Sequence, residues 1–209
     1  MNTSSPGPGR TGMILILSGP SGSGKSSIYK AAIGDLGGIE FSVSCNTRRP
    51  RPGEVDGRDY HFISREQFDA LVAENAFAEH AEVHGNCYGT LKSELLGRVR
   101  RGIDVLLDID VQGAAQLRAL CCDSAEFCEA CEVIFLMPPT FEELERRLRT
   151  RGTETEESIL RRLANAKGEM EHAHEYDHII VNDDLARAVK EFTELILGLR
   201  DHPKRRRTV

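Results

Sequence analysis

Short apolar runs alternate with longer amphipathic stretches along most of the chain. The runs predict strands at about 13–17, 41–44, 60–63, 77–83, 104–110, 132–137 and 178–183. Helical spacing predicts helices over about 25–33, 65–76 and 91–101, one beginning after Thr140, one ending near residue 172, and a last one over 185–199. This alternation favours an α/β fold, with a parallel sheet that helices cover on both faces. In such sheets ligands bind at the carboxyl ends of the strands.

One segment interrupts the alternation. Residues 45–59 are rich in Arg, Gly and Pro and show neither helical nor strand periodicity. Ser64 then opens a helix as a capping box with Gln67. We therefore expect a small subdomain inserted between elements of the main sheet.

Composition narrows the class of protein. The 209 residues, 40% of them hydrophobic, suit one compact domain. A net charge of -6 argues against a nucleic-acid partner, and the basic tail 201–209 is expected to be solvated. No apolar run approaches the ~18 residues that span a bilayer, and residues 1–12 resemble a flexible leader rather than a secretion signal. We expect a cytoplasmic protein without a membrane partner.

Four of the six cysteines cluster in "CCDSAEFCEAC", residues 121–131. A four-cysteine zinc site normally uses two CxxC pairs separated by a longer arm, whereas Cys121 and Cys122 are adjacent. Reduced thiols in a loop and helix are the favoured interpretation, and zinc the minor one.

The strand at 13–17 leads directly into a phosphate-binding motif. Residues 19–26 fit GxxxxGK[ST], in which backbone N–H groups cradle phosphates, Lys25 contacts the β and γ phosphates, and Ser26 can ligate Mg²⁺. The motif indicates a nucleoside triphosphate but no particular reaction. The ATP-binding residues that we expect here are Gly19, Pro20, Ser21, Gly22, Ser23, Gly24, Lys25, Ser26 and Ser27.

Several further segments resemble guanylate kinase, a family of P-loop nucleoside monophosphate kinases. They are "SVSCNTRRPRPGEVDGRDYHF", "FAEHAEVHGNCYGT", "DVLLDIDVQGA", "RRLRTRGTETEESILRRL" and "HIIVNDD". With the phosphate loop they extend over about 13–199. The resemblance implies direct in-line transfer of the ATP γ-phosphoryl group to GMP, and to dGMP, in purine nucleotide metabolism and GMP recycling.

The same resemblance implies three parts within a domain at 13–200. The expected core comprises 13–40, 91–145 and 170–200, the GMP-binding subdomain about 41–90, and the lid about 146–169.

The Arg-rich segment suits a phosphate dianion, which planar guanidinium groups and phenol hydroxyls hold well. By resemblance, the GMP phosphate is bound by Arg48, Arg51, Tyr60 and Tyr88, and Glu54 is a charged member of the same loop. A solvated charged turn is the alternative.

Guanine presents an N1–H and a 2-amino group, so one carboxylate can accept two hydrogen bonds from it. Adenine would leave that carboxylate buried and unpaired. By resemblance, Glu79 reads guanine, while Ser44 and Thr90 donate to its O6 and N7. Each residue alone would be read as an ordinary surface or capping residue.

"DIDVQG" resembles a Walker B segment. It implies Asp108 near Mg²⁺, directly or through water, and Asp110 toward GMP. A structural carboxylate at a strand end is the alternative for either residue.

The resemblance also assigns arginines to the transferring phosphoryl group, whose transition state spreads negative charge. Arg147, Arg151 and Arg162 are the expected lid arginines, with Lys25 and Arg48 as further catalytic cations. Asn182 and the aliphatic part of Arg151 are expected at the adenine. Surface ion pairs at helical spacing are the alternative, and they are the expected state of Arg146, Arg149 and Arg161.

Some residues depart from the family pattern. Cys45, Asn46 and Cys87 replace its usual residues beside the GMP pocket, and the connection at 119–132 is longer than expected. Two other functions are alternatives: a guanylate-kinase-like scaffold that binds protein ligands, and a P-loop kinase with another acceptor. A homodimer stays open.

Overall fold

The computed structural model describes residues 10–83, 85–150 and 155–205 of the chain. Its main sheet has five parallel strands in the order β2-β7-β1-β8-β9. The strands are β2 (Ile39–Phe41), β7 (Asp104–Asp108), β1 (Ile14–Ser18), β8 (Cys131–Met137) and β9 (His178–Val181). β1 lies in the middle, with Ile14 beside both Val105 and Cys131.

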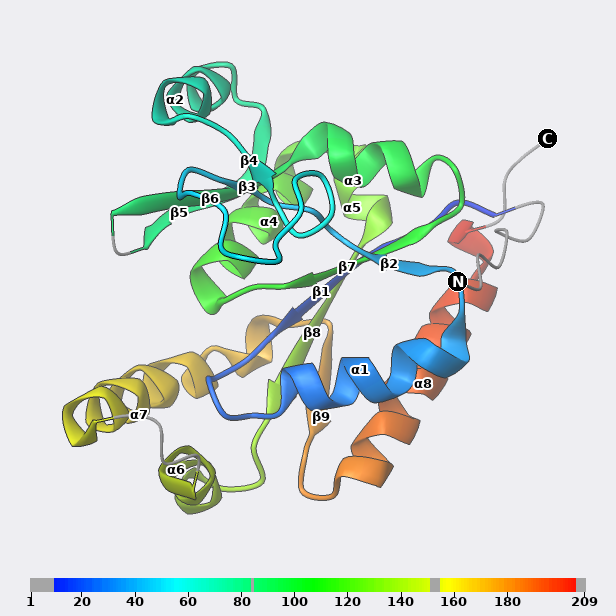
Figure 1. The fold of residues 1–209 in the computed structure, drawn as a ribbon. Coiled ribbons are helices and arrows are strands. Elements are labelled where there is room, and N and C mark those ends of the chain that lie inside the picture. The colour runs from blue at the N-terminus through cyan, green and yellow to red at the C-terminus, as the bar shows by residue number, and fades with distance from the viewer. Residues whose placement is uncertain (1–9, 84, 151–154, 206–209) are drawn as a thin grey trace.

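Helices cover both faces of this sheet (Figure 1). One face carries α1 (Lys25–Leu36) and α8 (Leu185–Asp201), and the other carries α3 (Lys92–Val99), α4 (Val111–Asp123) and α5 (Ala125–Ala130). Side chains of β1 alternate between the two hydrophobic cores, since Ile14 and Ile16 join one and Leu15 and Leu17 the other. The predicted α/β fold is confirmed.

A second, smaller sheet lies beyond one end of the main sheet, in the order β4-β3-β6-β5 (Figure 1). It contains β3 (Cys45–Asn46), β4 (His61–Phe62), β5 (Phe77–Val83) and β6 (Asn86–Leu91). Helix α2 (Arg65–Ala73) packs on it, with Phe68 stacked on Phe77 at 4.5 Å between ring centroids. Cys45 and Cys87 fill the same small core. The capping box of Ser64 and Gln67 is present at the start of α2.

A helix pair, α6 (Phe141–Thr150) and α7 (Glu156–Glu171), projects from the same end of the main sheet (Figure 1). The two helices share a cluster of buried side chains, which are Leu144, Leu148, Ile159, Leu163 and Ala166. The two projecting parts thus each have a core of their own.

Several predicted boundaries were wrong. The predicted strand 104–110 ends at Asp108, because Asp110 caps α4 by accepting a hydrogen bond from the Gly113 N–H at 2.9 Å. The predicted helix 91–101 begins at Lys92 instead, because Leu91 ends β6, a strand that was not predicted. No bounds were predicted for α4 or α5, although a loop and a helix were expected around the cysteines. Ser124 caps α5 and so divides the long connection into two helices.

The first and last described residues meet at the end of the main sheet opposite the phosphate loop. Arg10 pairs with the buried Asp104 at 2.7 Å, and the Thr11 N–H bonds the Arg205 carbonyl at 2.9 Å. Two short 3₁₀ helices, η1 (Ala173–Glu175) and η2 (Pro203–Arg205), complete the chain. Residues 10–12, expected in a flexible leader, and Arg205, expected in a solvated tail, are instead bonded to the folded domain.

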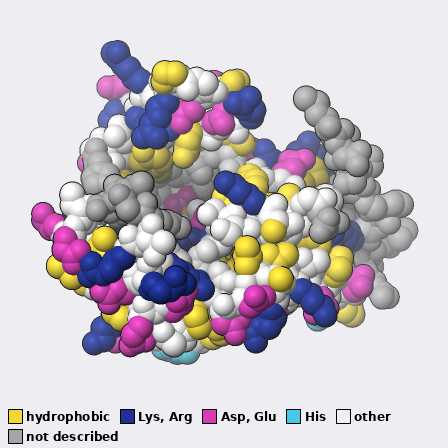
Figure 2. All heavy atoms as spheres, turned by 60° about the horizontal axis from the view of Figure 1, so that its bottom comes forward, with side chains coloured by type: hydrophobic (Ala, Val, Ile, Leu, Met, Phe, Trp, Pro, Cys, Tyr) yellow, Lys and Arg dark blue, Asp and Glu magenta, His cyan; other side chains and the backbone are white. Residues whose placement is uncertain are grey.

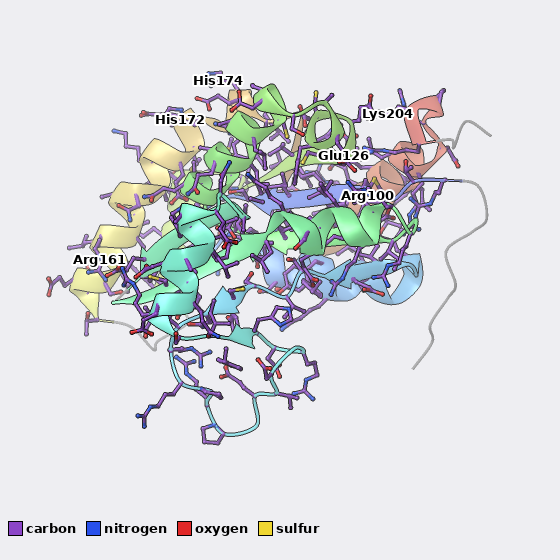
Figure 3. The ribbon with its side chains drawn as sticks, turned by 90° about the horizontal axis from the view of Figure 1, so that it is seen from above. Arg100, Glu126, Arg161, His172, His174 and Lys204 are labelled. Atoms are coloured by element: carbon purple, nitrogen blue, oxygen red, sulfur yellow. The ribbon has the colours of Figure 1, made fainter. Side chains whose placement is uncertain are left out.

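The long connection at 119–132 also forms an ion pair at the surface. Arg100, just after α3, lies next to Glu126 of α5, with Nε and Oε1 2.8 Å apart (Figure 3).

Within the described ranges, no helix has the length and apolar character needed to cross a membrane.

Candidate active site

The phosphate loop connects β1 to α1 and lines a cavity of about 360 Å³. Gly24 stands at the N-terminus of α1 in the left-handed conformation, with φ of 100°. A Cβ atom there would lie 2.3 Å from Nδ2 of Asn182, so both the backbone and its surroundings require glycine. The helix N-terminus therefore directs its N–H groups into the cavity, which suits an anion.

Lys25 and Asp108 face each other across this cavity. The Lys25 ammonium donates to the Gly19 carbonyl at 2.6 Å and lies 4.0 Å from the Asp108 carboxylate. Burial raises the pKa of Asp108, and the charge of Lys25 opposes the rise. Lys25 is thus held beside the loop at the predicted phosphate position.

Three predicted acceptor residues come together in the small sheet. The Thr90 hydroxyl donates to Oε1 of Glu79 at 2.6 Å, and the Ser44 and Thr90 hydroxyls are 3.1 Å apart. Glu79 is only 8% exposed. Burial raises its pKa, the Thr90 bonds lower it, and the charge of Asp110 raises it further. A buried carboxylate with one oxygen bonded to a hydroxyl is suited to accept N–H groups of a planar base.

The Arg-rich loop forms a second predicted cluster, which projects from the body in Figure 3. Two nitrogens of Arg48 bond the two Glu54 oxygens at 2.6 and 2.7 Å, and Glu54 also accepts the Arg51 N–H at 2.7 Å. These bonds lower the pKa of Glu54 to about 2. The Arg48 guanidinium lies 5.2 Å from the Tyr60 ring centroid, and the Tyr60 and Tyr88 rings are 6.2 Å apart.

This arrangement gives Glu54 a defined task that the sequence did not reveal. Its carboxylate holds the Arg48 guanidinium in a two-bond fork and so restricts where the cation can point. Arg51 is on the same turn and is exposed. The loop predicted to bind the GMP phosphate thus contains an internal ion pair that orients Arg48.

The helix pair contributes two arginines to the phosphate loop. Arg162 of α7 donates to the Ser21 hydroxyl at 2.8 Å. Arg147 of α6 donates to the Ser23 carbonyl at 3.5 Å, on the other side of the loop. It also bonds the Asn182 carbonyl at 2.9 Å and Glu143 at 2.8 Å. Arg151 lies outside the described residues.

Neighbouring arginines follow the surface alternative. Arg146 pairs with Glu143 at 2.7 Å and Arg149 pairs with Glu145 at 2.8 Å, both at helical spacing. Arg161 stands at the outer side of α7 (Figure 3). Position on the helix face, rather than residue type, separates these arginines from Arg162.

Asn182 follows β9 and is buried, at 5% exposure. Its amide donates to the Ser23 carbonyl at 2.7 Å, so it supports the phosphate loop from behind. It also helps to line a second cavity of about 390 Å³, next to the first and bordered by Gly22, Gly24, Ser27, Arg146, Arg147, Thr150, Asn182 and Leu185. This cavity is on the side where the adenine was expected.

One charged residue at the first cavity was missed by the sequence analysis. Glu169 of α7 lines it together with Asp108 and Asp110. Burial raises the pKa of Glu169, the charge of Lys25 lowers it and that of Asp110 raises it. No local pattern marks this glutamate, since α7 carries many charged residues and only its packing turns this one toward the loop.

The predicted Mg²⁺ site can be tested against the residues present. Among the described residues, no group of three or more His, Cys, Asp or Glu side chains could hold a metal ion alone. Ser26 and Asp108 nevertheless line the same cavity, and the Asp108 side chain is 31% exposed. Mg²⁺ commonly takes one or two protein oxygens and completes its shell with substrate phosphates and water, so these residues fit the ion.

Two sets of residues lie near each other: the phosphate loop with Lys25, and Ser44 with Glu79 and Thr90. Asp110, which lines the phosphate cavity, is close enough for its charge to act on Glu79. The surface is recessed between its upper and lower parts, with charged side chains around the rim (Figure 2). Asp110 links the two sets, because it lines the phosphate cavity and caps the helix that contacts Glu79. The site thus offers a position for nucleotide phosphates and, near it, a hydrogen-bonded set of polar groups suited to a planar base.

Comparison with known proteins agrees with this geometry. The family model described as guanylate kinase matches residues 11–198. A guanylate kinase of Syntrophotalea carbinolica is 50% identical over 189 residues, covering 90% of this chain and 87% of that protein. One of Nitratidesulfovibrio vulgaris is 50% identical over 182 residues, covering 87% and 84%.

Solved structures give the same result. The crystal structure of guanylate kinase from Anaplasma phagocytophilum matches with a TM-score of 0.67 and 34% identity, covering 94% of this chain and 90% of that one. Both the sequence and the fold therefore place this chain in the guanylate kinase family.

Proposed function

We propose that this protein transfers the γ-phosphoryl group of ATP to GMP, forming ADP and GDP. The observation that carries the proposal is the pairing of two sites, with Asp110 between them. One is the phosphate loop with Lys25, and the other is the hydrogen-bonded set of Ser44, Glu79 and Thr90. A donor nucleotide and a guanine base can be bound there at the same time.

In this proposal, the phosphate loop and Lys25 bind the ATP phosphates, while the cavity beside Asn182 takes the adenine. Arg48, Arg51, Tyr60 and Tyr88 bind the GMP phosphate. Glu79 accepts the guanine N1–H and 2-amino hydrogens, and Ser44 and Thr90 donate to the opposite edge of the base. Asp110 lies between the acceptor and the loop.

No general base is needed, because the attacking GMP phosphate oxygen is already anionic. Charge stabilisation is the main requirement, since the transition state is loose and negative. Lys25, Arg48, Arg147, Arg151 and Arg162 supply that charge. Ser26 and Asp108 would hold Mg²⁺, which neutralises charge on the β and γ phosphates when bound. The helix pair and the small sheet exclude water from the transfer.

We further propose that the protein works on free nucleotides in the cytoplasm, without a nucleic-acid partner. The net charge of -6 supports this, since it disfavours binding to a polyanion.

The test is a coupled assay of ADP formation with ATP and Mg²⁺, comparing GMP with AMP, CMP and UMP. Activity with GMP alone, lost in Lys25→Ala, is the expected result. Folded wild-type protein that is inactive with GMP would refute the proposal.

A further inference from the structure

Helix α4 and strand β5 are joined by a paired contact. Oε1 of Gln116 accepts the His80 N–H at 3.0 Å, and Nε2 of Gln116 donates to the His80 carbonyl at 3.0 Å. A single side-chain amide thus forms hydrogen bonds with both the N–H and the carbonyl of His80. Because β5 is an edge strand of the small sheet, this amide acts on the side that no strand covers.

The strand is irregular at this point. Phe77 pairs with Leu91 and Glu79 pairs with Thr90, so Ala78 is an extra residue in β5. A bulge of this kind disrupts the ladder locally and redirects the next side chain, which here is Glu79. The ladder with β6 alone therefore defines Glu79 less firmly than a regular strand would.

Helix α4 also touches the Glu79 carboxylate. A Cβ atom at Gly113 would lie 3.3 Å from Oε2 of Glu79, so only a glycine leaves this oxygen its full space. Gly113 and Gln116 are three residues apart and lie on the same face of α4. On that face, Gly113 lies next to Glu79 and Gln116 bonds His80. Figure 1 shows α4 running beside the small sheet.

The same helix begins at the phosphate end of the site. Asp110 caps α4 and lines the cavity of the phosphate loop. A rigid helix of 13 residues thus joins the phosphate position to the strand that carries Glu79.

We propose that Gln116 is a positioning residue for the acceptor, which holds Glu79 at the place where the guanine base is read. This inference rests on the proposed function. Gln116 does not itself line the phosphate cavity, and acts through the main chain of His80. The ratio of activity on GMP to activity on inosine monophosphate reports its action, because the second base lacks the 2-amino group that Glu79 would accept.

Loss of the Gln116 amide should change the position of β5 more than the stability of the protein. Gln116 borders an open cleft of about 500 Å³, lined also by Asn75, Phe77, Lys92 and Asp123. Water from this cleft can replace the two lost hydrogen bonds, so little stability is lost. Water does not hold β5 at a fixed distance from α4, so Glu79 gains freedom.

The test is Gln116→Met, which preserves side-chain length and removes both hydrogen bonds. Gln112→Met is the matched control, because Gln112 is an exposed glutamine on the same helix. We expect Gln116→Met to raise the KM for GMP about tenfold and to lower the GMP to inosine monophosphate ratio of kcat/KM about fivefold. The KM for ATP and the Tm should stay near wild type.

Hydrogen exchange provides a readout besides activity. The His80 amide should exchange at least about tenfold faster in Gln116→Met than in wild type or Gln112→Met. An unchanged nucleotide ratio in an active Gln116→Met enzyme would overturn this inference alone. Wild-type protein that does not act on GMP would overturn the proposed function and this inference together.

Discussion

At the scale of single residues, burial decides the chemistry of Glu79. Many glutamates are exposed in this chain, whereas Glu79 is 8% exposed and hydrogen-bonded to Thr90. A buried carboxylate that is not paired with a cation favours a ligand with N–H groups, because these groups replace the hydrogen bonds to water that burial removed. The residue type was readable from the sequence, but its environment was not.

We predict that Glu79→Gln lowers kcat/KM for GMP about a hundredfold, because an amide cannot accept both guanine N–H groups through one end. The Tm at neutral pH should rise, because the buried charge is removed. Since the pKa of Glu79 is raised in the folded protein, its ionised form costs stability above that pKa, and the cost disappears as the pH falls. Steady-state kinetics and thermal unfolding measure the two effects, and a lower Tm in the variant would contradict the second.

The same pKa shift predicts a pH dependence for the wild type. Only ionised Glu79 accepts both N–H groups, so the KM for GMP should rise on acidification, starting above the ordinary pH range of a glutamate. GMP itself gains a proton near pH ~6. Glu79→Gln should show that substrate effect alone, so coincident wild-type and variant profiles would reject the assignment.

The cysteines give a prediction that needs no substrate. Cys122 and Cys128 are exposed, whereas Cys45, Cys87 and Cys131 are buried. Burial, with the nearby charge of Glu94, raises the pKa of Cys45 to about 11. A chromogenic disulfide reagent at pH 8 should therefore label Cys122 and Cys128 first, and Cys45 only after denaturation. Mass spectrometry of peptides identifies the order, and early labelling of Cys45 would contradict the described packing.

At the scale of elements, the phosphate loop is shaped by a residue that is distant in sequence. Asn182 bonds the Ser23 carbonyl at 2.7 Å and fills the space beside Gly24. The loop motif itself is local, but its support comes from the end of β9.

We predict that Gly24→Ala raises the KM for ATP at least about tenfold and lowers the Tm, because the new Cβ meets Asn182 and the φ of 100° is strained for alanine. Gly97→Ala is the control: Gly97 lies within α3 with no atom near its Cβ position, and alanine there should stabilise by about 0.5–1 kcal/mol. Kinetics and calorimetry on both variants test the pair. Wild-type ATP affinity in Gly24→Ala would refute the close contact.

At the scale of the whole molecule, charged side chains have different roles at the two ends of the main sheet. At the active end, Lys25 and Arg162 bond groups of the phosphate loop and leave their charge beside its cavity. At the opposite end, Arg205 is 2% exposed and bonds Glu132 at 2.5 Å. The charges there join the C-terminal segment to strand β8. The basic tail, expected to be solvated, supplies this contact.

We predict that Arg205→Met destabilises the protein by about 2 kcal/mol, which lowers the Tm by about 4–8 °C. Glu132 would lose one partner, while Lys204 remains at 2.5 Å. Glu132→Gln added to this variant should recover part of the loss, and the KM values should not change. An Arg205→Met protein as stable as wild type would show that the contact contributes nothing.

Glu132 also links this contact to pH. Burial raises its pKa, but bonds from Lys204 and His178 and the charge of Arg205 outweigh this and leave the pKa below its ordinary value. A lowered carboxyl pKa stabilises the fold above the unfolded pKa, and the stabilisation is lost as the pH falls. The Tm difference between wild type and Glu132→Gln should therefore shrink in acid.

The sequence by itself determined the class of fold, the phosphate loop, the capping box of α2 and the residue types of the base pocket. These features depend on neighbours in the chain or on a residue pattern that resembles a known family. Only the tertiary structure decided which arginines face the loop, where Glu169 points, and how Gln116 and Asn182 support the site. Such contacts join segments 30 or more residues apart, and local periodicity carries no information about which distant backbone a side chain will meet.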